Sequence, residues 1–332
     1  MRSHVISSRF PVMLLLSLCV LLAACGQNTA SPVSATTRPT PTPATVLDAY
    51  GTPIVFPPTA PQRIISLLPS DSEVLGALHL QSRVVAVDYY TTYPPALAAL
   101  PKISDANGNY NIEKIVALKP DLILSYGGET RTTDQRLASL GLHVVDLPLT
   151  NFSQALQQIL LVGRLTFTQS VATALVNQLQ QQIDHIKAAV AGTSAPKVLL
   201  EVDDSTPGKP YVFGGGSFGD EMLQDARGIN IFHNDTSNGG YPQVTDEAII
   251  AADPQYVILT EDPNYGGNPA SVYKRPDWGS IDALKMHHVY HINVNIMQHP
   301  GPRLVEGLQC LAQILHPDKF NSPLPAYCSA TV

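Results

Sequence analysis

Short runs of β-branched and aliphatic residues alternate with helical patterns twice along this chain, and this repeat constrains the fold most strongly. The first set of runs covers residues 63–67, 83–87, 121–125 and 143–147, and the second covers 197–202, 229–232, 256–260 and 289–293. Apolar runs of this length, separated by helices, are typical of parallel sheets covered on both faces. The sequence therefore predicts an α/β fold with two similar lobes, each built on a mostly parallel sheet.

A second repeated pattern supports the two lobes. Residues 113–120 form a short helical pattern that stops at a Pro and leads into the run at 121, and residues 247–254 do the same before the run at 256. The residue before a Pro disfavours helix, so both helices should end there. Earlier in each half, a Glu-x-Leu begins a helical pattern, at Glu73 and at Glu221.

A long helical pattern separates the two sets of runs. Apolar residues recur at helical spacing from Val171 to Val190, with Thr168 as a plausible N-cap and Gly192 as a plausible stop. About two dozen residues at 1.5 Å each span roughly 36 Å, enough to cross one face of a two-lobed molecule. We expect a first lobe at 60–166, a linker helix at 167–192, and a second lobe with its tail at 193–332; an ordinary helix within one lobe is the alternative.

The first 24 residues have the features of a signal peptide. Arg2 and Arg9 precede an apolar run at 12–24, which is too short to span a membrane as a mature helix. The run ends in Leu-Ala-Ala-Cys25-Gly, which resembles the bacterial lipobox and implies cleavage before Cys25 and lipid on its sulfur. An ordinary secretory peptide with a chance Cys is the alternative. Residues 25–59 would then hold the lipidated Cys, a Thr/Pro-rich tether and the start of the first lobe.

This interpretation predicts an exported protein, lipid-anchored at the outer face of the cytoplasmic membrane. Outside the leader and the anchor, Cys310 and Cys328 remain, and an oxidising compartment favours a disulfide between them over two buried thiols. The formal charge of −7, with no block of Lys or Arg, excludes a nucleic-acid wrapping function. Four Cys in 332 residues also exclude a disulfide-built mini-fold and a four-Cys zinc module.

An ordered set of segments carries a family resemblance over nearly all of residues 60–318. The segments are Pro61-Gln-Arg-Ile-Ile-Ser-Leu-Leu-Pro-Ser-Asp-Ser-Glu73, 93–95, 111–115, 118–122, 214–221, Trp278 and Pro300-Gly-Pro-Arg303. In this order they resemble the helical-backbone periplasmic binding proteins that feed cobalamin, ferric-siderophore and haem ABC importers. The resemblance implies a monomeric solute-binding protein that captures its ligand between two lobes and delivers it to a permease and its ATPase. It implies neither catalysis nor a resident cofactor or metal.

The resemblance also implies that one exposed Glu on each lobe pairs with Arg on the permease. Glu73 and Glu221 are the matching positions in this sequence. A structural role is the alternative, because Ser70 to Glu73 fits a capping box, and Ser217 with Asp220 fits a weaker version. The duplicated Glu-x-Leu favours docking for the pair.

Candidate ligand contacts follow the strands, because a crevice forms outside the carboxyl ends of parallel strands. Three Tyr in the loop after the second run offer flat faces with polar tips, which suit a corrin or porphyrin ring. These are Tyr89, Tyr90 and Tyr93. The other candidates are Tyr126 and Gly127 after the third run, and Tyr211, Phe213, Gly215, Ser217, Trp278 and Arg303 in the second half.

Among the ligands of the family, a corrinoid is favoured. The segments 300–307 and 214–218 look most like those of the cobalamin-binding members. The candidate cleft loops also lack the cluster of Lys and Arg that a polyanionic ferric siderophore favours. The single Trp departs from the pattern of the cobalamin binders, which often use more, and leaves a siderophore or haem open.

Three other functions remain open. The G-x-S-x-G pattern at 215–219 predicts a serine hydrolase with Ser217 as nucleophile, although an N-cap at Ser217 explains the pattern more simply. The partners of that serine would be Asp246 or Asp262 and His287 or His291.

A metal site would draw on His287, His288, His291 and His299 with His79 or His143, but histidines in turns leading to a strand are the simpler interpretation. A surface adhesion or sensor module without a permease is the third.

Overall fold

The computed structural model describes residues 45–148, 151–262 and 266–328. The predicted signal peptide, the lipobox with Cys25 and nearly all of the tether therefore lie outside the described residues. Within the described part of the chain, no helix is long and apolar enough to cross a membrane.

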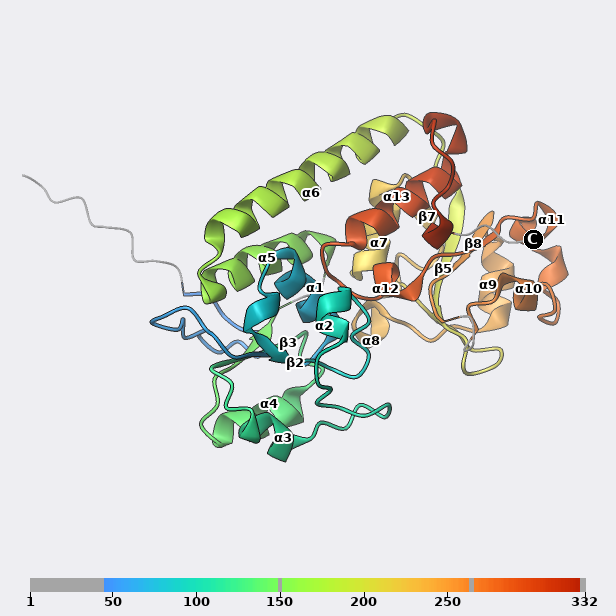
Figure 1. The fold of residues 1–332 in the computed structure, drawn as a ribbon. Coiled ribbons are helices and arrows are strands. Elements are labelled where there is room, and N and C mark those ends of the chain that lie inside the picture. Colours follow the sequence, from blue (N-terminus) through green and yellow to red (C-terminus); the bar gives the residue numbers. More distant parts are fainter. Residues whose placement is uncertain (1–44, 149–150, 263–265, 329–332) are drawn as a thin grey trace, which may run out of the picture. The chain divides into compact units, whose positions relative to one another are not determined.

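The first lobe is built on a four-stranded parallel sheet (Figure 1). Its strands are β1 (Ile64–Ser66), β2 (Val84–Ala86), β3 (Leu122–Tyr126) and β4 (Val144–Leu147), in the spatial order β2-β1-β3-β4. Alternate residues of a strand face opposite sides of a sheet, and both sides here are apolar and buried. Ile64 and Leu122 pack with the helices on one face, whereas Ile65 and Ile123 belong to a separate apolar cluster on the other.

The helices of the first lobe cover both faces of this sheet. They are α1 (Pro69–Ala77), α2 (Pro95–Ala98), α3 (Ile112–Ala117), α4 (Arg131–Ser139) and α5 (Phe152–Thr166), with a 3₁₀ turn η1 (Gln81–Arg83). α1 and α5 lie on one side of the sheet, and α3 and α4 lie on the other (Figure 1). This double cover explains why the strands read as continuous apolar runs in the sequence.

The second lobe is built on a five-stranded mixed sheet. Its strands are β5 (Lys197–Asp203), β6 (Tyr211–Val212), β7 (Ile229–Asn230), β8 (Tyr256–Leu259) and β9 (Val289–His291). β5 pairs in parallel with β7 and β8, β8 pairs in parallel with β9, and β6 is antiparallel to β5. Each of the eight predicted runs overlaps one strand, so the two-lobed α/β fold is confirmed. The two-residue β6 is the strand that the sequence analysis missed.

The second lobe carries more and shorter helices than the first. They are α7 (Phe218–Asp225), α8 (Ser237–Gly240), α9 (Asp246–Ala252), α10 (Pro269–Val272), α11 (Asp282–Lys285), α12 (Val294–Met297) and α13 (Leu304–Leu315). Three 3₁₀ turns complete it, η2 (Trp278–Ser280), η3 (Pro317–Lys319) and η4 (Ala326–Cys328).

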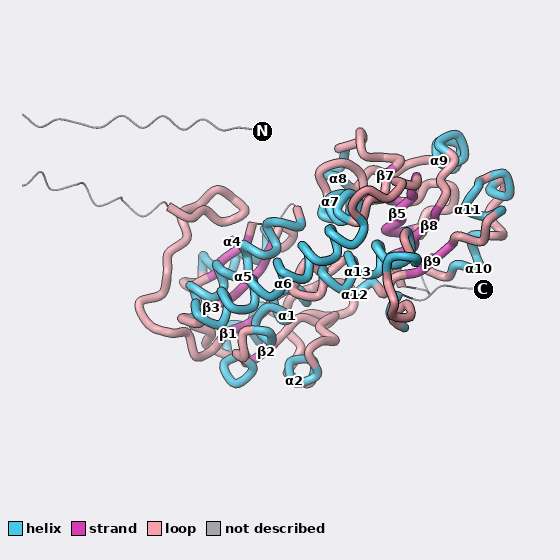
Figure 2. The backbone as a smooth tube through the Cα atoms, turned by 90° about the horizontal axis from the view of Figure 1, so that it is seen from above, coloured by secondary structure: helices cyan, strands magenta, loops and turns pink. Residues whose placement is uncertain are grey.

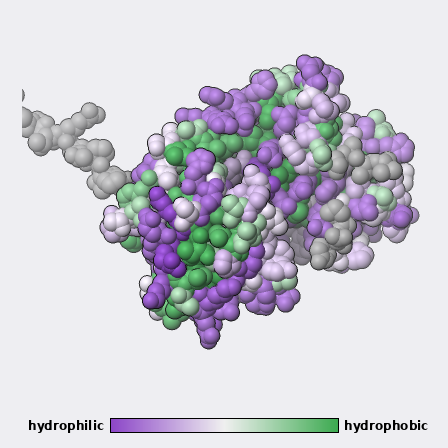
Figure 3. Space-filling model, in the orientation of Figure 1, coloured by the Kyte–Doolittle hydropathy of each residue, from purple (hydrophilic) through white to green (hydrophobic). Residues whose placement is uncertain are grey.

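The chain passes from the first sheet to the second through α5 and then α6 (Gln169–Val190), a helix of 22 residues. The buried residues of α6 recur at helical spacing, and α6 packs against both α5 and α13. Figure 2 shows it crossing between the two groups of strands, with β1 and β3 on one side and β5 and β8 on the other. Hydrophilic side chains predominate along the upper edge of the molecule in the view of Figure 3, over which α6 runs in Figure 1. Gln180, Gln181 and Gln182 of α6 are exposed.

A disulfide fastens the end of the chain to the second lobe. Cys310 in α13 and Cys328 in η4 are joined, the pairing that the sequence analysis favoured, with their Cα atoms 5.4 Å apart. Both residues are fully buried. The backbone N–H of Asn293 also donates to the carbonyl of Tyr327, so the tail is held at two points.

Candidate functional site

A cavity of about 440 Å³ lies where the strand ends of the first lobe meet a loop of the second. Three loops of the first lobe reach it: Leu68 follows β1, Asp88 follows β2 and Glu129 follows β3. The second lobe contributes Gln298 and His299, from the loop between α12 and α13. The cavity thus has the position that parallel sheets give to a ligand site, at the carboxyl edge and between lobes.

The first-lobe wall of this cavity is acidic. Asp88 and Glu129 line it, and no Lys or Arg is among its described lining residues. Asp71 lies next to the lining residue Ser70, is fully buried, and neither of its carboxyl oxygens has a hydrogen-bond partner. Burial, followed by the negative charge of Asp146, raises the pKa of Asp71 well above its usual range. Asp88 and Glu129 therefore make the wall favour hydrogen-bond donors over anions, whereas the raised pKa of Asp71 favours its uncharged form, which does not repel anions.

The three Tyr of the loop after β2 occupy different positions. Tyr90 lines the cavity, and its hydroxyl donates to the carbonyl of Ala106 at 2.5 Å. Tyr89 meets Tyr90 edge-on, with ring centroids 5.1 Å apart. Tyr93 lies instead beneath the guanidinium of Arg303, 4.2 Å from the ring centroid. Of the three, Tyr90 is the one at the cavity.

Tyr126 is the last residue of β3, and the exposed Gly127 follows it at the same sheet edge. Gly127 and Gly128 both have positive φ, 68° and 77°, a conformation that glycine adopts without strain. This turn lets the backbone N–H of Gly128 donate to the carboxylate of Asp146 in β4. The glycines thus shape the strand end beside the cavity.

Most of the side chains predicted to contact the ligand from the second lobe do not lie at this cavity. Phe213, Ser217 and Trp278 are almost completely buried within that lobe, so their side chains cannot touch a ligand in this conformation. Gly215 is buried too, and a Cβ there would lie 1.9 Å from the carbonyl oxygen of His233. Tyr211 is half-buried in β6, whose partner is β5. None of these five is among the residues that line the cavity.

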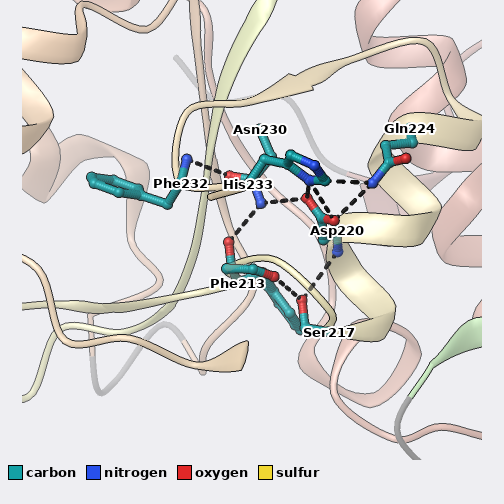
Figure 4. Close-up of polar contacts among 8 residues, drawn as sticks. Phe213, Ser217, Asp220, Gln224, Asn230, Phe232 and His233 are labelled. Carbon is teal, nitrogen blue, oxygen red and sulfur yellow. Dashed lines mark hydrogen bonds and ion pairs between the residues drawn. The ribbon is translucent and has the colours of Figure 1, made fainter. Parts of the chain in front are cut away.

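Ser217 is the N-cap of α7 (Figure 4). Its hydroxyl accepts from the backbone N–H of Asp220 at 3.2 Å and donates to the carbonyl of Gly214 at 2.7 Å. The carboxylate of Asp220 does not close a capping box. It receives the side-chain amide of Asn230 at 2.9 Å and faces Nδ1 of His233 at 3.0 Å.

The serine hydrolase hypothesis is not supported by this geometry. A nucleophile needs an exposed hydroxyl next to a base, whereas Ser217 is buried and bonded to backbone atoms. Of the histidines considered, the Nε2 atom of His291 contacts the carbonyl of Glu261, 2.8 Å away. Among the residues that the structure describes, no group of three or more His, Cys, Asp or Glu could hold a metal ion.

Trp278 packs instead in a group of buried charges in the second lobe. Its ring lies 4.5 Å from the guanidinium of Arg275, which bonds both carboxylate oxygens of Glu201 at 2.7 and 2.6 Å. Asp204 accepts a third bond from Arg275, at 2.8 Å. Burial, and then the charge of Glu201, raises the pKa of Glu261 to about 9, so Glu261 stays protonated at neutral pH.

Glu73 does not have the exposure that permease docking requires. Its side chain is 2% exposed and accepts two bonds from Arg303, one of them from Nε at 3.0 Å. It is not a helix cap either, because α1 begins at Pro69 and Ser70 Oγ has no partner. Gly301 comes so close that a Cβ there would lie 3.2 Å from Oε2 of Glu73. The ion pair therefore joins α1 of the first lobe to the start of α13 in the second.

Glu221 makes the corresponding contact from the other lobe. It lies in the first turn of α7 and accepts from the backbone N–H of Phe152 at 2.7 Å and from the hydroxyl of Ser153 at 2.6 Å. Phe152 and Ser153 begin α5, the last helix of the first lobe. The two contacts thus follow one pattern. Glu73, in the first helix of the first lobe, bonds the start of α13 in the second lobe, and Glu221, in the first helix of the second lobe, bonds the start of α5 in the first lobe. We call Glu73–Arg303 and Glu221–Phe152/Ser153 the crossed contacts.

Four residues that line the cavity were not predicted to contact the ligand. They are Tyr110, Glu129, Gln298 and His299, of which the sequence analysis considered only His299, as a candidate metal ligand. Tyr110 reaches the cavity because its hydroxyl donates to the carbonyl of Leu67 at 2.6 Å, across the ends of two loops. No local pattern marks these positions, since Tyr110 and Glu129 come together through the tertiary structure of the first lobe, and Gln298 and His299 reach them from the second.

The comparisons with known proteins agree with this architecture. The profile of the family described as periplasmic binding protein matches residues 64–295. An uncharacterized ABC transporter substrate-binding lipoprotein of Bacillus subtilis is 30% identical over 315 residues, or 92% of this chain and 96% of that protein. A cobalamin-binding protein of Halobacterium salinarum is 28% identical over 280 residues, or 82% of this chain and 74% of that protein.

A solved structure shows the same likeness. It is that of a possible iron-binding (periplasmic solute-binding) protein of Staphylococcus epidermidis, with a TM-score of 0.68 and 27% identity, covering 78% of this chain and all of that one. The fold of this chain is therefore that of a bilobed solute-binding protein. The chain belongs to the periplasmic binding protein family, whose members are substrate-binding proteins of ABC transporters.

Proposed function

We propose that this protein captures cobalamin or a related corrinoid between its lobes and, as a monomer, delivers it to a membrane permease driven by an ATPase. The observation that carries the proposal is the acidic cavity at the strand ends, which has no Lys or Arg among its described lining residues. A corrinoid presents neutral carboxamide N–H donors, whereas carboxylate and catecholate chelators present anions. The likeness to a cobalamin-binding protein supports the same choice.

The alternative cargo is a ferric siderophore or haem, which the likeness to a possible iron-binding protein favours. Calorimetric titration with cyanocobalamin, haemin and a panel of ferric siderophores separates the candidates. We expect saturable, one-to-one binding of cyanocobalamin, tighter than that of any anionic siderophore. Tight binding of a siderophore with no heat from cyanocobalamin would contradict the corrinoid proposal and leave the transport role intact.

We also propose that lipid on Cys25 holds the mature protein at the outer face of the cytoplasmic membrane. The Leu-Ala-Ala-Cys-Gly sequence supports this, and so does the name of the Bacillus subtilis relative, a lipoprotein. The Thr/Pro-rich residues that follow would serve as an extended tether between the anchor and the first lobe.

The docking acids need a different assignment from the one made on sequence. Glu73 is buried, and the carboxylate of Glu221 accepts a hydrogen bond from the backbone N–H of Phe152 at the start of α5. Two other acids are exposed at matching places, Glu113 in the first turn of α3 and Glu247 in the first turn of α9. Each begins the short helix that stops before a Pro and leads into a buried strand, β3 or β8. We therefore propose that Glu113 and Glu247 contact basic residues of the permease.

The double variant Glu113→Ala/Glu247→Ala tests this docking role. We expect uptake of labelled ligand by cells to fall about tenfold, the factor for about 1.4 kcal/mol of lost binding free energy, with ligand affinity unchanged. Asp184→Ala, which removes an exposed acid on α6, is the matched control and should leave uptake unaffected. Uptake by the double variant equal to that of the control would show that these two acids do not dock.

A further inference from the structure

Three buried acids lie behind the first-lobe wall of the cavity, and we call them the acid cluster. Asp71 of α1 is fully buried, Asp134 of α4 is 3% exposed and Asp146 of β4 is 1% exposed. In the described part of the chain, no Lys, Arg or His forms an ion pair with any of them. Three buried negative charges without a cation are very costly, so the cluster retains protons.

Hydrogen-bond donors are divided unequally among the three acids. Asp134 accepts from the hydroxyl of Tyr50 at 2.7 Å and from that of Ser125 at 2.8 Å. Asp146 accepts from the backbone N–H of Gly128 at 3.1 Å, and the oxygen of Ser125 is 3.3 Å away. A hydroxyl has one proton, so Ser125 serves one acid at a time. Asp134 is therefore the better stabilised carboxylate, and a proton shared by the pair resides on Asp146.

Hydrogen bonds connect the acid cluster to the cavity. The hydroxyl of Thr130, which lines the cavity, donates to Oδ1 of Asp134 at 3.0 Å. Two residues earlier, Gly128 is held by Asp146, so both acids fasten the turn that carries Glu129 and Thr130. A change of charge in the cluster therefore reaches the cavity wall through these bonds and through the field in a medium of low dielectric constant.

The charge of the cluster changes near neutral pH. Burial raises the pKa of Asp146 to about 6, and hydrogen bonding with Asp134 adds to the rise, whereas the bonds from Tyr50 and Gly128 oppose it. Asp71, whose oxygens have no hydrogen-bond partner, keeps its proton at neutral pH because burial raises its pKa much further. The cluster thus gains one negative charge between about pH 5 and pH 7.

Other charged or titratable groups surround the cluster. They are Tyr50, Tyr110, Asp88, Glu129 and Arg131. Burial raises the pKa of both tyrosines well above the usual value, so they keep their protons, and Arg131 stays charged over the ring of Tyr50. His299 lines the cavity from the second lobe, and histidine as a residue type also titrates in this range, so a test has to separate it from Asp146.

Resting on the proposed capture of a corrinoid, we propose that the acid cluster makes capture proton-linked. In acid, Asp146 of the empty protein holds a proton; when a cargo with N–H donors binds, the O–H bond of Asp146 breaks and the proton passes to solvent water. The ionised cluster favours donors at the wall, so the cargo binds more tightly near neutral pH than in acid.

Calorimetric titration with cyanocobalamin at pH 5 and pH 7 tests this linkage. One pH unit below the pKa of Asp146, about one molecule in eleven has the ionised cluster, so the affinity should fall by up to about tenfold from pH 7 to pH 5. Asp146→Asn resembles the protonated acid and should show the weaker affinity at both pH values. Asp184→Asn, at an exposed acid of α6, is the matched control and should keep the wild-type profile.

Two further measurements do not depend on the affinity of the Asn variant. At pH 6, wild type should release about half a proton for each cyanocobalamin bound, which heats measured in two buffers of different ionisation enthalpy reveal. The free energy of unfolding of wild type, relative to Asp184→Asn, should also fall as the pH rises from about 4 to about 6, because folded Asp146 binds its proton more tightly than the unfolded chain does.

The outcomes separate this inference from the function on which it rests. Equal affinity of wild type at pH 5 and pH 7, with no proton released, would overturn the linkage and leave capture intact. A pH dependence that persists in Asp146→Asn would assign it to another group such as His299 and would also overturn the proposal. No binding of cyanocobalamin at pH 7 would overturn the corrinoid cargo and the linkage together.

Discussion

Replacing Glu201 by Ala is expected to lower the free energy of unfolding by about 3 to 5 kcal/mol, the cost of stranding a buried charge. Glu201 is fully buried, and the side chain of Arg275 is 10% exposed. Without the carboxylate, the guanidinium of Arg275 keeps Asp204 as an ion-pair partner but loses two bonds of 2.7 and 2.6 Å. Urea denaturation of the purified protein measures the difference.

An exposed ion pair supplies the control for this variant. Lys285 and Asp282 lie 3.3 Å apart with side chains 56% and 45% exposed, so Asp282→Ala should cost less than about 1 kcal/mol. The double variant Glu201→Leu/Arg275→Leu should recover part of the loss, because it removes both members of the buried pair and deprives only Asp204, whose side chain is 20% exposed, of its ion pair with Arg275. If Glu201→Ala lowers the free energy of unfolding no more than Asp282→Ala does, the buried ion pair contributes little to stability.

Replacing Glu73 by Ala is expected to have the second-largest effect, because it breaks one of the two crossed contacts. Arg303, with 18% of its side chain exposed, would lose the carboxylate that it bonds through two nitrogens. We expect a loss of about 3 kcal/mol in the free energy of unfolding and a larger radius of gyration by small-angle scattering, since the tie between α1 and α13 is gone.

Glu113→Ala is the matched control for the Glu73 variant. It removes an exposed acid from the same lobe and should change the free energy of unfolding by less than about 0.5 kcal/mol and the radius of gyration not at all. A Glu73 variant as stable and as compact as this control would mean that the ion pair does not hold the lobes. Loss of uptake without loss of stability in the Glu73 variant would instead return Glu73 to the docking surface.

The strands and the long helix could be predicted because their signals are local. Each strand is buried on both faces, so it appears as an apolar run, and α6 has one buried stripe along its length. The predicted helix at 167–192 exceeds α6 by two residues at each end, which is the usual uncertainty of a cap. β6 was missed because its two residues stand between Pro210 and the glycines at 214–216 with no longer apolar run around them, whereas the equally short β7 lies within the run at 229–232.

The environment of Glu73 could not be predicted, because its partner Arg303 is 230 residues away in the sequence. The capping-box prediction failed for a local reason: Pro is preferred in the first turn of a helix, so α1 begins at Pro69 and places Ser70 inside the helix. Arg303 was predicted to contact the ligand, but it forms an ion pair with Glu73. The sequence could not reveal this pair, because its two members lie 230 residues apart.

The positions of the aromatic side chains likewise depend on tertiary contacts that the sequence does not reveal. Trp278 and Phe213 have the chemistry of a ligand contact, but packing against the core of the second lobe decided their place. Tyr90 was predicted correctly as a residue at the strand ends because its loop directly follows β2, and it lines the cavity. His299 and Gln298 approach from the opposite lobe, so only the tertiary structure reveals them.

The bond between Cys310 and Cys328 distinguishes the newly made chain from the finished one. Under the export proposed above, a precursor in the reducing interior of the cell would have its last residues unfastened from α13, because thiols stay reduced there. A cross-link closing a loop of this size is worth about 3 kcal/mol, so the unbridged chain would resist unfolding less and would pass through a membrane more easily. Oxidation in the compartment outside would then stabilise the folded state after that passage.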